Sequence, residues 1–168
     1  MRQVYKRRGY SDEWINARLQ SIMAREEVTA EWRERGAQEG REFAISTEIL
    51  HEGTFAIATE QHKAIKALKK RDNLRDSMTP LELVLTTLSE VTATELHRER
   101  DAQGMSELSD DTQAAGEVAG ATRRDVEARL GRPVVSPENA KSLTQRPERQ
   151  PALFGPDEAK DEGENKGR

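Results

Sequence analysis

Residues 79–100 read TPLELVLTTLSEVTATELHRER, and this stretch decides the fold class. Thr79 stands where a helix N-cap is expected, Pro80 suits the first helical turn, and Glu82 completes a capping box. The aliphatic residues that follow keep the spacing of one helical face for about four turns. These residues are Leu81, Val84, Leu85, Leu88, Val91 and Leu96. We therefore predict a long helix over residues 80–100.

The same periodicity continues on both sides of this stretch, and the alternation typical of strands is nearly absent. Ser11 is expected to cap a first helix, and Thr29, Thr47 and Thr59 are expected to begin three more. The apolar positions of the first and last of these helices are Trp14, Ile15, Leu19, Ile22, Met23, Ile65 and Leu68. The sequence thus predicts an all-α domain of about five to six helices over residues 1–132.

Residues 109–130 predict a last helix, which Gly131 closes at its C-terminal end. Gly116 and Gly120 lie inside this helix, among alanines. Interior glycines cost about 1 kcal/mol each relative to alanine, so the close approach of another helix is expected to compensate. We expect the helix at 80–100 to pack against this glycine-alanine face. The alternative is a weak helix that frays until a partner binds.

The composition predicts a thin core and a separate tail. Leu, Ile, Val and Phe make up only 30 of 168 residues, while 27 basic and 31 acidic side chains leave a net charge of −4. This near balance of charge argues against disorder of the whole chain. Five of the six prolines follow residue 132, and the last dozen residues are almost all charged or glycine. We expect residues 133–168 to form a Pro-rich, charged, disordered tail.

Several classes of protein are disfavoured. The absence of Cys excludes disulfides, thiolate metal sites and cysteine nucleophiles. His51, His62 and His97 lack the mutual spacing of metal ligands and are expected to be partly exposed helix residues. Phosphate-binding loops and nucleophile elbows are also missing. We therefore expect a protein that is not an enzyme, with no catalytic residues, no cofactor and no metal.

The chain also lacks membrane and secretion signals. Its uninterrupted aliphatic runs are far shorter than the roughly 18 residues that a membrane-spanning helix needs. The basic N-terminal residues are not followed by the apolar stretch of a secretory signal. We therefore expect a cytoplasmic protein that does not contact membranes.

Residues 63–75, KAIKALKKRDNLR, carry six basic side chains and one acidic side chain. The basic ones are Lys63, Lys66, Lys69, Lys70, Arg71 and Arg75. Such a run can neutralise several phosphates and give weak, salt-dependent binding to nucleic acid. The alternative is a solvated helix face and helix end, where cations also offset the carbonyl dipole. A smaller cluster contains Lys6, Arg7 and Arg8.

The tail contains a short apolar motif, QPALF, at residues 150–154. A Leu-Phe pair in a charged segment either docks on its own body or fills a pocket of a partner. The motif resembles the bacterial sliding-clamp-binding pentapeptide at Gln150, Leu153 and Phe154. Pro151 departs from the leucine that is common at the second position. The DNA sliding clamp is therefore one candidate partner.

Longer stretches resemble the bacterial DNA damage-inducible protein D (DinD) family, in the same order along the chain from about residue 5 to residue 140. They read RRGYSDEWINARLQSI, VTAEWRERG, EFAISTEIL, GTFAIATEQHKAIKALK, NLRDSMTPLELVLTTLSEVTATELHRERDAQG and GEVAGATRRDVEARLGRPVVSPEN. Members usually carry a phage-type Bro-N domain before this region. The resemblance covers only the C-terminal region that follows the Bro-N domain.

The resemblance implies a cytoplasmic, non-enzymatic protein of the DNA-damage (SOS) response. The family activity it points to is antagonism of RecA filaments on single-stranded DNA, so the RecA filament is the expected partner. Two alternatives remain. One is a phage-derived, antirepressor-like DNA-binding protein that uses residues 63–75. The other is an orphan fragment of a Bro-N protein whose function left with the missing domain.

Overall fold

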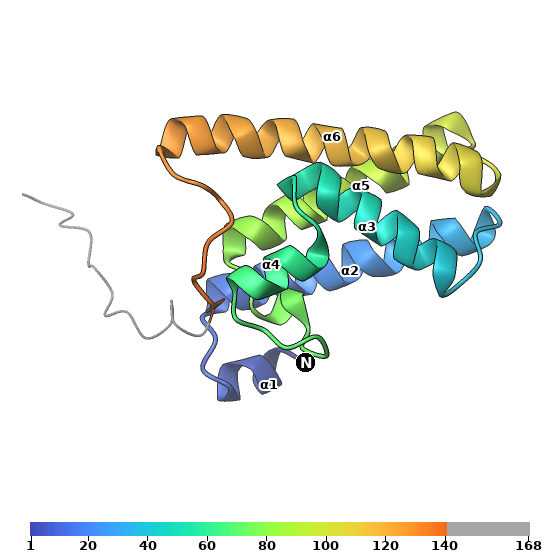
Figure 1. Ribbon diagram of the computed structural model, residues 1–168. Coiled ribbons are helices and arrows are strands. Elements are labelled where there is room, and N and C mark those ends of the chain that lie inside the picture. Colours follow the sequence, from blue (N-terminus) through green and yellow to red (C-terminus); the bar gives the residue numbers. More distant parts are fainter. Residues whose placement is uncertain (141–168) are drawn as a thin grey trace, which may run out of the picture.

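The computed structural model of the chain describes residues 1–140, which fold into helices without β-strands (Figure 1). The elements are α1 (Arg2–Arg7), α2 (Asp12–Glu34), α3 (Arg41–Phe55), α4 (Thr59–Ile65), the short 3-10 helix η1 (Leu74–Asp76), α5 (Pro80–Arg100) and α6 (Gly104–Leu130). The predicted all-α class is therefore confirmed. Within residues 1–140, no helix has the length and apolar character needed to cross a membrane.

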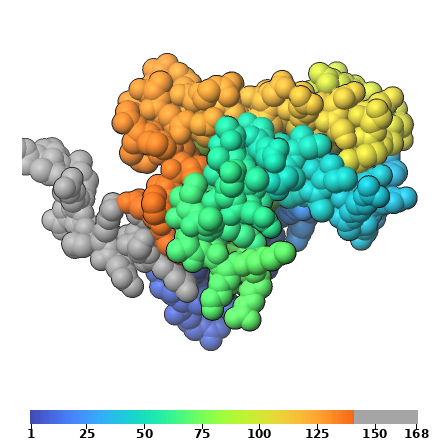
Figure 2. Space-filling view, viewed as in Figure 1, coloured from blue at the N-terminus to red at the C-terminus, as the bar shows by residue number. Residues whose placement is uncertain are grey.

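Four long helices build the body. Helix α6 packs along α3 and α5, and α2 packs along α5. Figure 1 shows α6 as the top layer, with α1 and α4 towards one end of the bundle. In the space-filling view of Figure 2, α3 and α4 cover the face turned to the viewer, below α6. The site described below lies where α3, α4 and α5 meet.

The apolar core has two parts, which suits the small number of aliphatic residues. The first part holds an aromatic group near the N-terminus, in which Tyr10 stacks on Trp14 with ring centroids 3.9 Å apart. The Trp14 indole N–H donates to the Met78 carbonyl at 2.8 Å. The second part gathers around the buried Trp32, which meets Phe43 edge-on. The two tryptophans therefore anchor the two ends of α2.

The helix caps that the sequence predicts most directly are present. The Ser11 hydroxyl accepts from the Trp14 amide at 3.2 Å. Thr79 and Glu82 form the reciprocal capping box, because the Thr79 amide donates to the Glu82 carboxylate at 2.8 Å and the Glu82 amide donates to the Thr79 hydroxyl at 3.3 Å. Gly131 ends α6 in the left-handed conformation with φ 69°. Local sequence thus sets these three boundaries.

Other predicted boundaries are wrong. Thr29 lies inside α2 and Thr47 inside α3, where their hydroxyls donate to carbonyls one turn earlier. Because threonine can satisfy its hydroxyl within a helix in this way, it does not have to start one. Thr59 is the first residue of α4 rather than its cap, and α6 begins at Gly104 rather than at Ser109.

The glycines of α6 mark a close helix crossing, as predicted, but the partner is α3. A Cβ atom added to Gly53 would lie 2.7 Å from the Cα atom of Gly116. A Cβ atom added to Gly120 would overlap the Gly53 carbonyl oxygen. Helix α5 packs on α6 as well, so the predicted pairing of these two helices is present. The close approach that offsets the glycines, however, is made by α3.

Helix α5 buries polar as well as aliphatic residues. Val84 and Val91 of the predicted aliphatic face are 51% and 44% exposed, whereas Leu85 of that face is buried together with Glu82 and Glu90. The two carboxylates can be buried because both find cationic partners on other segments. The aliphatic spacing predicts this helix correctly, but it identifies only part of the surface that the fold buries.

The folded body continues past the predicted boundary of the tail. Val134 and Ala140 are buried in the first core cluster. The ammonium of Lys66 donates to the carbonyl oxygen of Glu138 at 2.6 Å and also reaches the carbonyl of Ser136. Residues 133–140 are therefore a strap that closes one end of the bundle.

Candidate functional site

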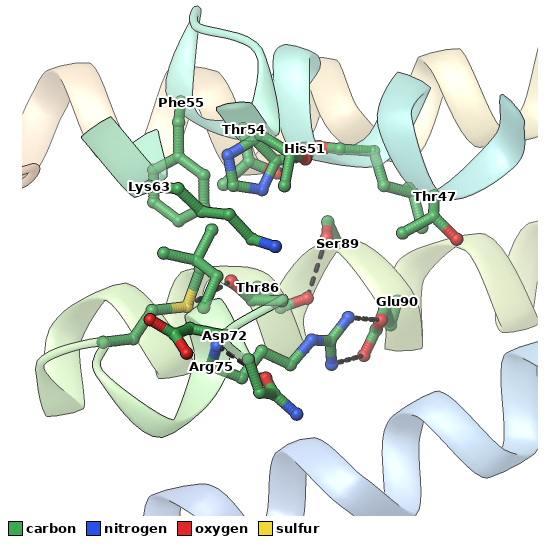
Figure 3. A pocket seen from close by; sticks show the side chains of 15 residues that line it. Thr47, His51, Thr54, Phe55, Lys63, Asp72, Arg75, Thr86, Ser89 and Glu90 are labelled. Atoms are coloured by element: carbon green, nitrogen blue, oxygen red, sulfur yellow. Dashed lines mark hydrogen bonds and ion pairs between the residues drawn. The ribbon is translucent and has the colours of Figure 1, made fainter. Parts of the chain in front are cut away.

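A half-open cavity of about 350 Å³ lies between α3, α4 and α5, and the segment from Asp72 to Met78 closes one side (Figure 3). Part of its wall is apolar, formed by Leu50, Phe55, Leu74 and Met78. The polar side chains in the wall include Thr47, His51, Thr54, Lys63, Asp72, Arg75, Thr86, Ser89 and Glu90. A volume of this size falls in the range of small-molecule sites.

Glu90 and Arg75 form the charged wall of the cavity. The Arg75 guanidinium contacts both carboxylate oxygens of Glu90, with one of these hydrogen bonds at 3.1 Å, and also donates to the Ser21 hydroxyl. Arg25 approaches the same carboxylate at 3.7 Å, and burial lowers the pKa of its guanidinium. Arg75, one of the candidate nucleic-acid contacts, therefore serves mainly to neutralise a buried carboxylate.

A chain of hydrogen bonds runs behind the cavity. His51 Nε2 lies 3.2 Å from His62 Nδ1, and His62 Nε2 lies 3.2 Å from Glu82 Oε1. The second oxygen of Glu82 lies 2.9 Å from the Lys66 ammonium, and both of these side chains are fully buried. All four side chains thus share one network, and Lys66, a second candidate nucleic-acid contact, faces the interior.

Burial and hydrogen bonding set the charges of Glu82 and His51 in this network. Burial alone would raise the pKa of the Glu82 carboxyl, but hydrogen bonds from His62 and Lys66 and the charge of Lys66 lower it. Burial and the neighbouring His62 lower the pKa of His51 to about 4, so its ring is neutral at neutral pH. The two nitrogens of His62 thus bridge the neutral His51 ring and the ionised Glu82 carboxylate. The His51 ring also lines the cavity, where it presents a neutral polar surface.

A second polar cluster joins α2, α5 and α6. The Trp32 indole N–H donates to His97 Nε2 at 3.1 Å, and His97 Nδ1 donates to Asp111 at 3.1 Å. Arg100 holds the other oxygen of Asp111 at 2.7 Å. Burial lowers the pKa of His97 although Asp111 opposes the shift. Both ring nitrogens are occupied, so this histidine has no free nitrogen with which to accept a proton from a ligand.

The prediction that the histidines are partly exposed is wrong for all three. His51, His62 and His97 are buried. Each ring has at least one hydrogen-bond partner inside the protein, which makes burial tolerable. Among residues 1–140, no group of three or more His, Asp or Glu side chains is arranged to hold a metal ion.

The structure separates the six basic candidates of residues 63–75. Lys66 and Arg75 point inward, as described above. Lys63 lines the cavity, and its ammonium donates to the Lys70 carbonyl at 2.8 Å. The three remaining cations are exposed on the loop that leads to the cavity. They are Lys69, Lys70 and Arg71.

The cavity itself was not predicted from the sequence, because its wall comes from four segments that are far apart in the chain. One feature of the sequence could have indicated the cavity. Thr86, Ser89 and Glu90 share a polar face of α5 inside an otherwise aliphatic helix. The tail motif formed by Gln150, Leu153 and Phe154 lies outside the described residues.

Comparison with protein-family models, with curated proteins and with solved structures finds no match to this chain.

Proposed function

We propose that this chain is a non-enzymatic, cytoplasmic protein of the DNA-damage response that binds and modulates the recombination machinery. Its target in this proposal is the RecA filament on single-stranded DNA, which it antagonises. The proposal joins the resemblance of about residues 5–140 to the DNA damage-inducible protein D family with the surface features of the body. The chain acts by binding and takes no catalytic step.

The observation that carries the proposal is the exposed aliphatic stripe of α5. Leu81, Val84, Leu88 and Val91 share one helical face, on which both valines are exposed and both leucines are half-buried. Single exposed aliphatic residues are ordinary, but neighbouring ones along a helix are typical of a surface that another protein covers. Leu83 and Leu85 of the same helix enter the core, so the exposed valines lie on a separate strip that suits a binding module.

The stretches that carry the resemblance also meet one another in the folded body. Gly53 opens one stretch and Gly116 opens another, and these two glycines form the close crossing of α3 and α6. Lys66 and Glu82 come from two different stretches and form the buried ion pair. The residues that support the resemblance are thus among those that hold the body together.

A phage-derived DNA-binding protein is the second candidate function. The exposed cations Lys69, Lys70 and Arg71 favour it, because they lie together on one loop. Under this alternative, affinity for duplex DNA falls steeply with added salt and is lost when these three cations are replaced by glutamine. Under the main proposal, the replacement leaves RecA binding largely intact.

The tail carries a further candidate contact. Gln150, Leu153 and Phe154 are proposed to bind the DNA sliding clamp independently of the body. Leu153→Ala combined with Phe154→Ala removes both apolar anchors and leaves residues 1–140 unchanged. Clamp binding that survives this double substitution would exclude the motif.

Sedimentation of RecA filaments on single-stranded DNA tests the proposed function. The unmodified chain is expected to bind the filaments and move RecA from the pellet to the supernatant, and Val84→Glu with Val91→Glu is expected to leave RecA in the pellet, because the charges disrupt an apolar contact. The matched control is Ile45→Glu with Val118→Glu, which alters similarly exposed aliphatic residues on α3 and α6. If the control pair loses binding and the α5 pair does not, the α5 stripe is not the contact surface.

A further inference from the structure

We infer that the cavity between α3, α4 and α5 binds one nucleotide, with the base inside and the phosphate at the cationic mouth. This inference rests on the proposed function, because single-stranded DNA is the ligand that a filament brings to this surface. The nucleotide is either a unit of such a strand or a free nucleoside monophosphate. Three features of the site carry the inference.

The first feature is that Arg75 and Glu90, the charged groups on the α5 side of the cavity, are bonded to each other. Burial keeps His51, on the opposite wall, neutral. This part of the wall therefore favours a neutral polar group over an ionic ligand.

The second feature is the mixed lining. Phe55 and Met78 supply apolar surface, while Thr47, Ser89 and the neutral His51 ring supply hydrogen-bonding atoms. A flat heteroaromatic base presents apolar faces and a polar edge, so it matches both kinds of wall. Base-binding sites on proteins combine the same two elements.

The third feature is the charge at the mouth. A second hollow of about 330 Å³ shares Thr59 and Lys63 with the cavity and extends to Lys70 and Glu60. The charged residues that line the two hollows at this opening are the cations Lys63 and Lys70 and the carboxylates of Glu60 and Asp72. Lys69 and Arg71, on either side of Lys70 in the chain, add two exposed cations to the same loop. The Asp72 carboxylate accepts from the Lys69 amide at 2.8 Å and so shapes the loop. A phosphate at this opening would be attracted by the excess of cations.

Fluorescence anisotropy with a labelled oligothymidylate tests the inference. We expect binding to the intact strand and about tenfold weaker binding to a strand of the same length made of abasic sites, which keeps the phosphates but lacks the bases. Unlabelled thymidine monophosphate that competes would show that a free nucleotide suffices, whereas competition only by the strand would assign the site to DNA. Equal affinity for the abasic and intact strands would overturn the inference.

Two variants locate the binding. Thr47→Phe places a ring in the cavity and is expected to weaken oligothymidylate binding about tenfold. The control is Thr122→Phe, because Thr122 also bonds a carbonyl of its own helix but lies on the exposed side of α6. Unchanged affinity of Thr47→Phe, with its circular dichroism spectrum intact, would overturn the inference.

Two triple substitutions test whether the cations near the mouth of the cavity contribute to binding. Lys69→Gln, Lys70→Gln and Arg71→Gln together are expected to weaken binding and to flatten its salt dependence. Lys6→Gln, Arg7→Gln and Arg8→Gln remove the same charge elsewhere and are expected to leave both unchanged.

RecA disassembly is measured in parallel to separate this inference from the proposed function. If the unmodified chain disassembles filaments and Thr47→Phe does so equally, with oligothymidylate affinity also unchanged, the nucleotide site fails while the function stands. If the cavity binds the oligonucleotide as expected but the unmodified chain leaves filaments intact, the function fails and the nucleotide site stands.

Discussion

The Lys66 ammonium lies 2.9 Å from the Glu82 carboxylate, and both side chains are fully buried. Lys66 also donates to the backbone of the strap at residues 133–140, so one ammonium joins α5 to the end of the described chain. The three acceptors are the Glu82 carboxylate and the carbonyls of Ser136 and Glu138, and they match the three N–H donors of the ammonium. This ion pair therefore links the end of α4 to both α5 and the strap.

Lys66→Met is therefore expected to lower the free energy of unfolding by about 3–5 kcal/mol, because it leaves the Glu82 carboxylate buried without its cation. Urea unfolding followed by tryptophan fluorescence measures this change. Lys69→Met serves as the control, because Lys69 is exposed, and a change within about 0.5 kcal/mol is expected there. Equal losses in the two variants would contradict the assigned role of Lys66.

Gly120→Ala tests the crossing of α3 and α6. On an open helix surface, this substitution would stabilise by about 1 kcal/mol through helix propensity. Here the new methyl group would overlap the Gly53 carbonyl, so we expect a net loss of about 1–3 kcal/mol as the helices are forced apart. Ala121→Gly is the matched control on the exposed side of the same helix, with an expected loss of about 1 kcal/mol from propensity alone. A stabilised Gly120→Ala variant would show that the crossing is looser than described.

The free energy of unfolding is expected to fall as the pH is lowered, because His51 is held neutral in the folded protein. The unfolded chain protonates this residue near its ordinary pKa of 6.5, whereas the folded chain does so only near pH 4. Between these values the unfolded state binds more protons, so the free energy of unfolding falls as the pH falls, by up to about 3 kcal/mol in total. Glu82, whose folded pKa is lowered, adds a further loss below its unfolded pKa of 4.5.

The His51→Gln variant isolates this contribution. Its free energy of unfolding is expected to change less steeply between pH 6.5 and pH 4 than that of the unmodified chain, although His97 still contributes a slope of the same sign. Urea unfolding at a series of pH values gives both slopes. Identical slopes would mean that His51 does not carry the acid sensitivity.

The cluster of Trp32, His97 and Asp111 gives a fourth expectation. His97→Phe leaves the Trp32 indole N–H and one oxygen of Asp111 without their partner in a buried site. Each buried group left unsatisfied costs about 1–3 kcal/mol, so we expect a loss of several kcal/mol and a shift of tryptophan emission. Arg98→Ala is the comparison, since Arg98 lies one residue away but is half-exposed, and a much smaller loss is expected. A variant as stable as the unmodified chain would show that the cluster adds nothing.

Local signals predicted much of the fold. Thr79, Pro80 and Glu82 fix the start of α5, and Gly131 fixes the end of α6, because caps depend on residues within one turn. The interior glycines of α6 correctly predicted a close helix neighbour. The identity of that neighbour depends on Gly53, which sits in a distant helix, and no local pattern reveals such a contact.

The buried faces and the site could not be predicted in the same way. Glu82 is buried because Lys66 and His62 meet it, and the spacing of α5 alone favours the aliphatic face instead. The run of cations at residues 63–75 looks uniform as sequence, yet tertiary contacts draw Lys66 and Arg75 inward and place Lys63 in the cavity wall. Lys69, Lys70 and Arg71 stay exposed. The sequence therefore supplied candidate residues, while their partners decided which ones face the cavity.

Disassembly of RecA filaments is the sharpest test of the proposed function. Filaments are preformed on fluorescent single-stranded DNA, and the full chain is titrated in beside the variant with Leu153→Ala and Phe154→Ala. We predict dose-dependent disassembly by both proteins, since the activity is assigned to the body and not to the tail motif. Filaments that stay intact at saturating concentrations of the unmodified chain would contradict the proposed function.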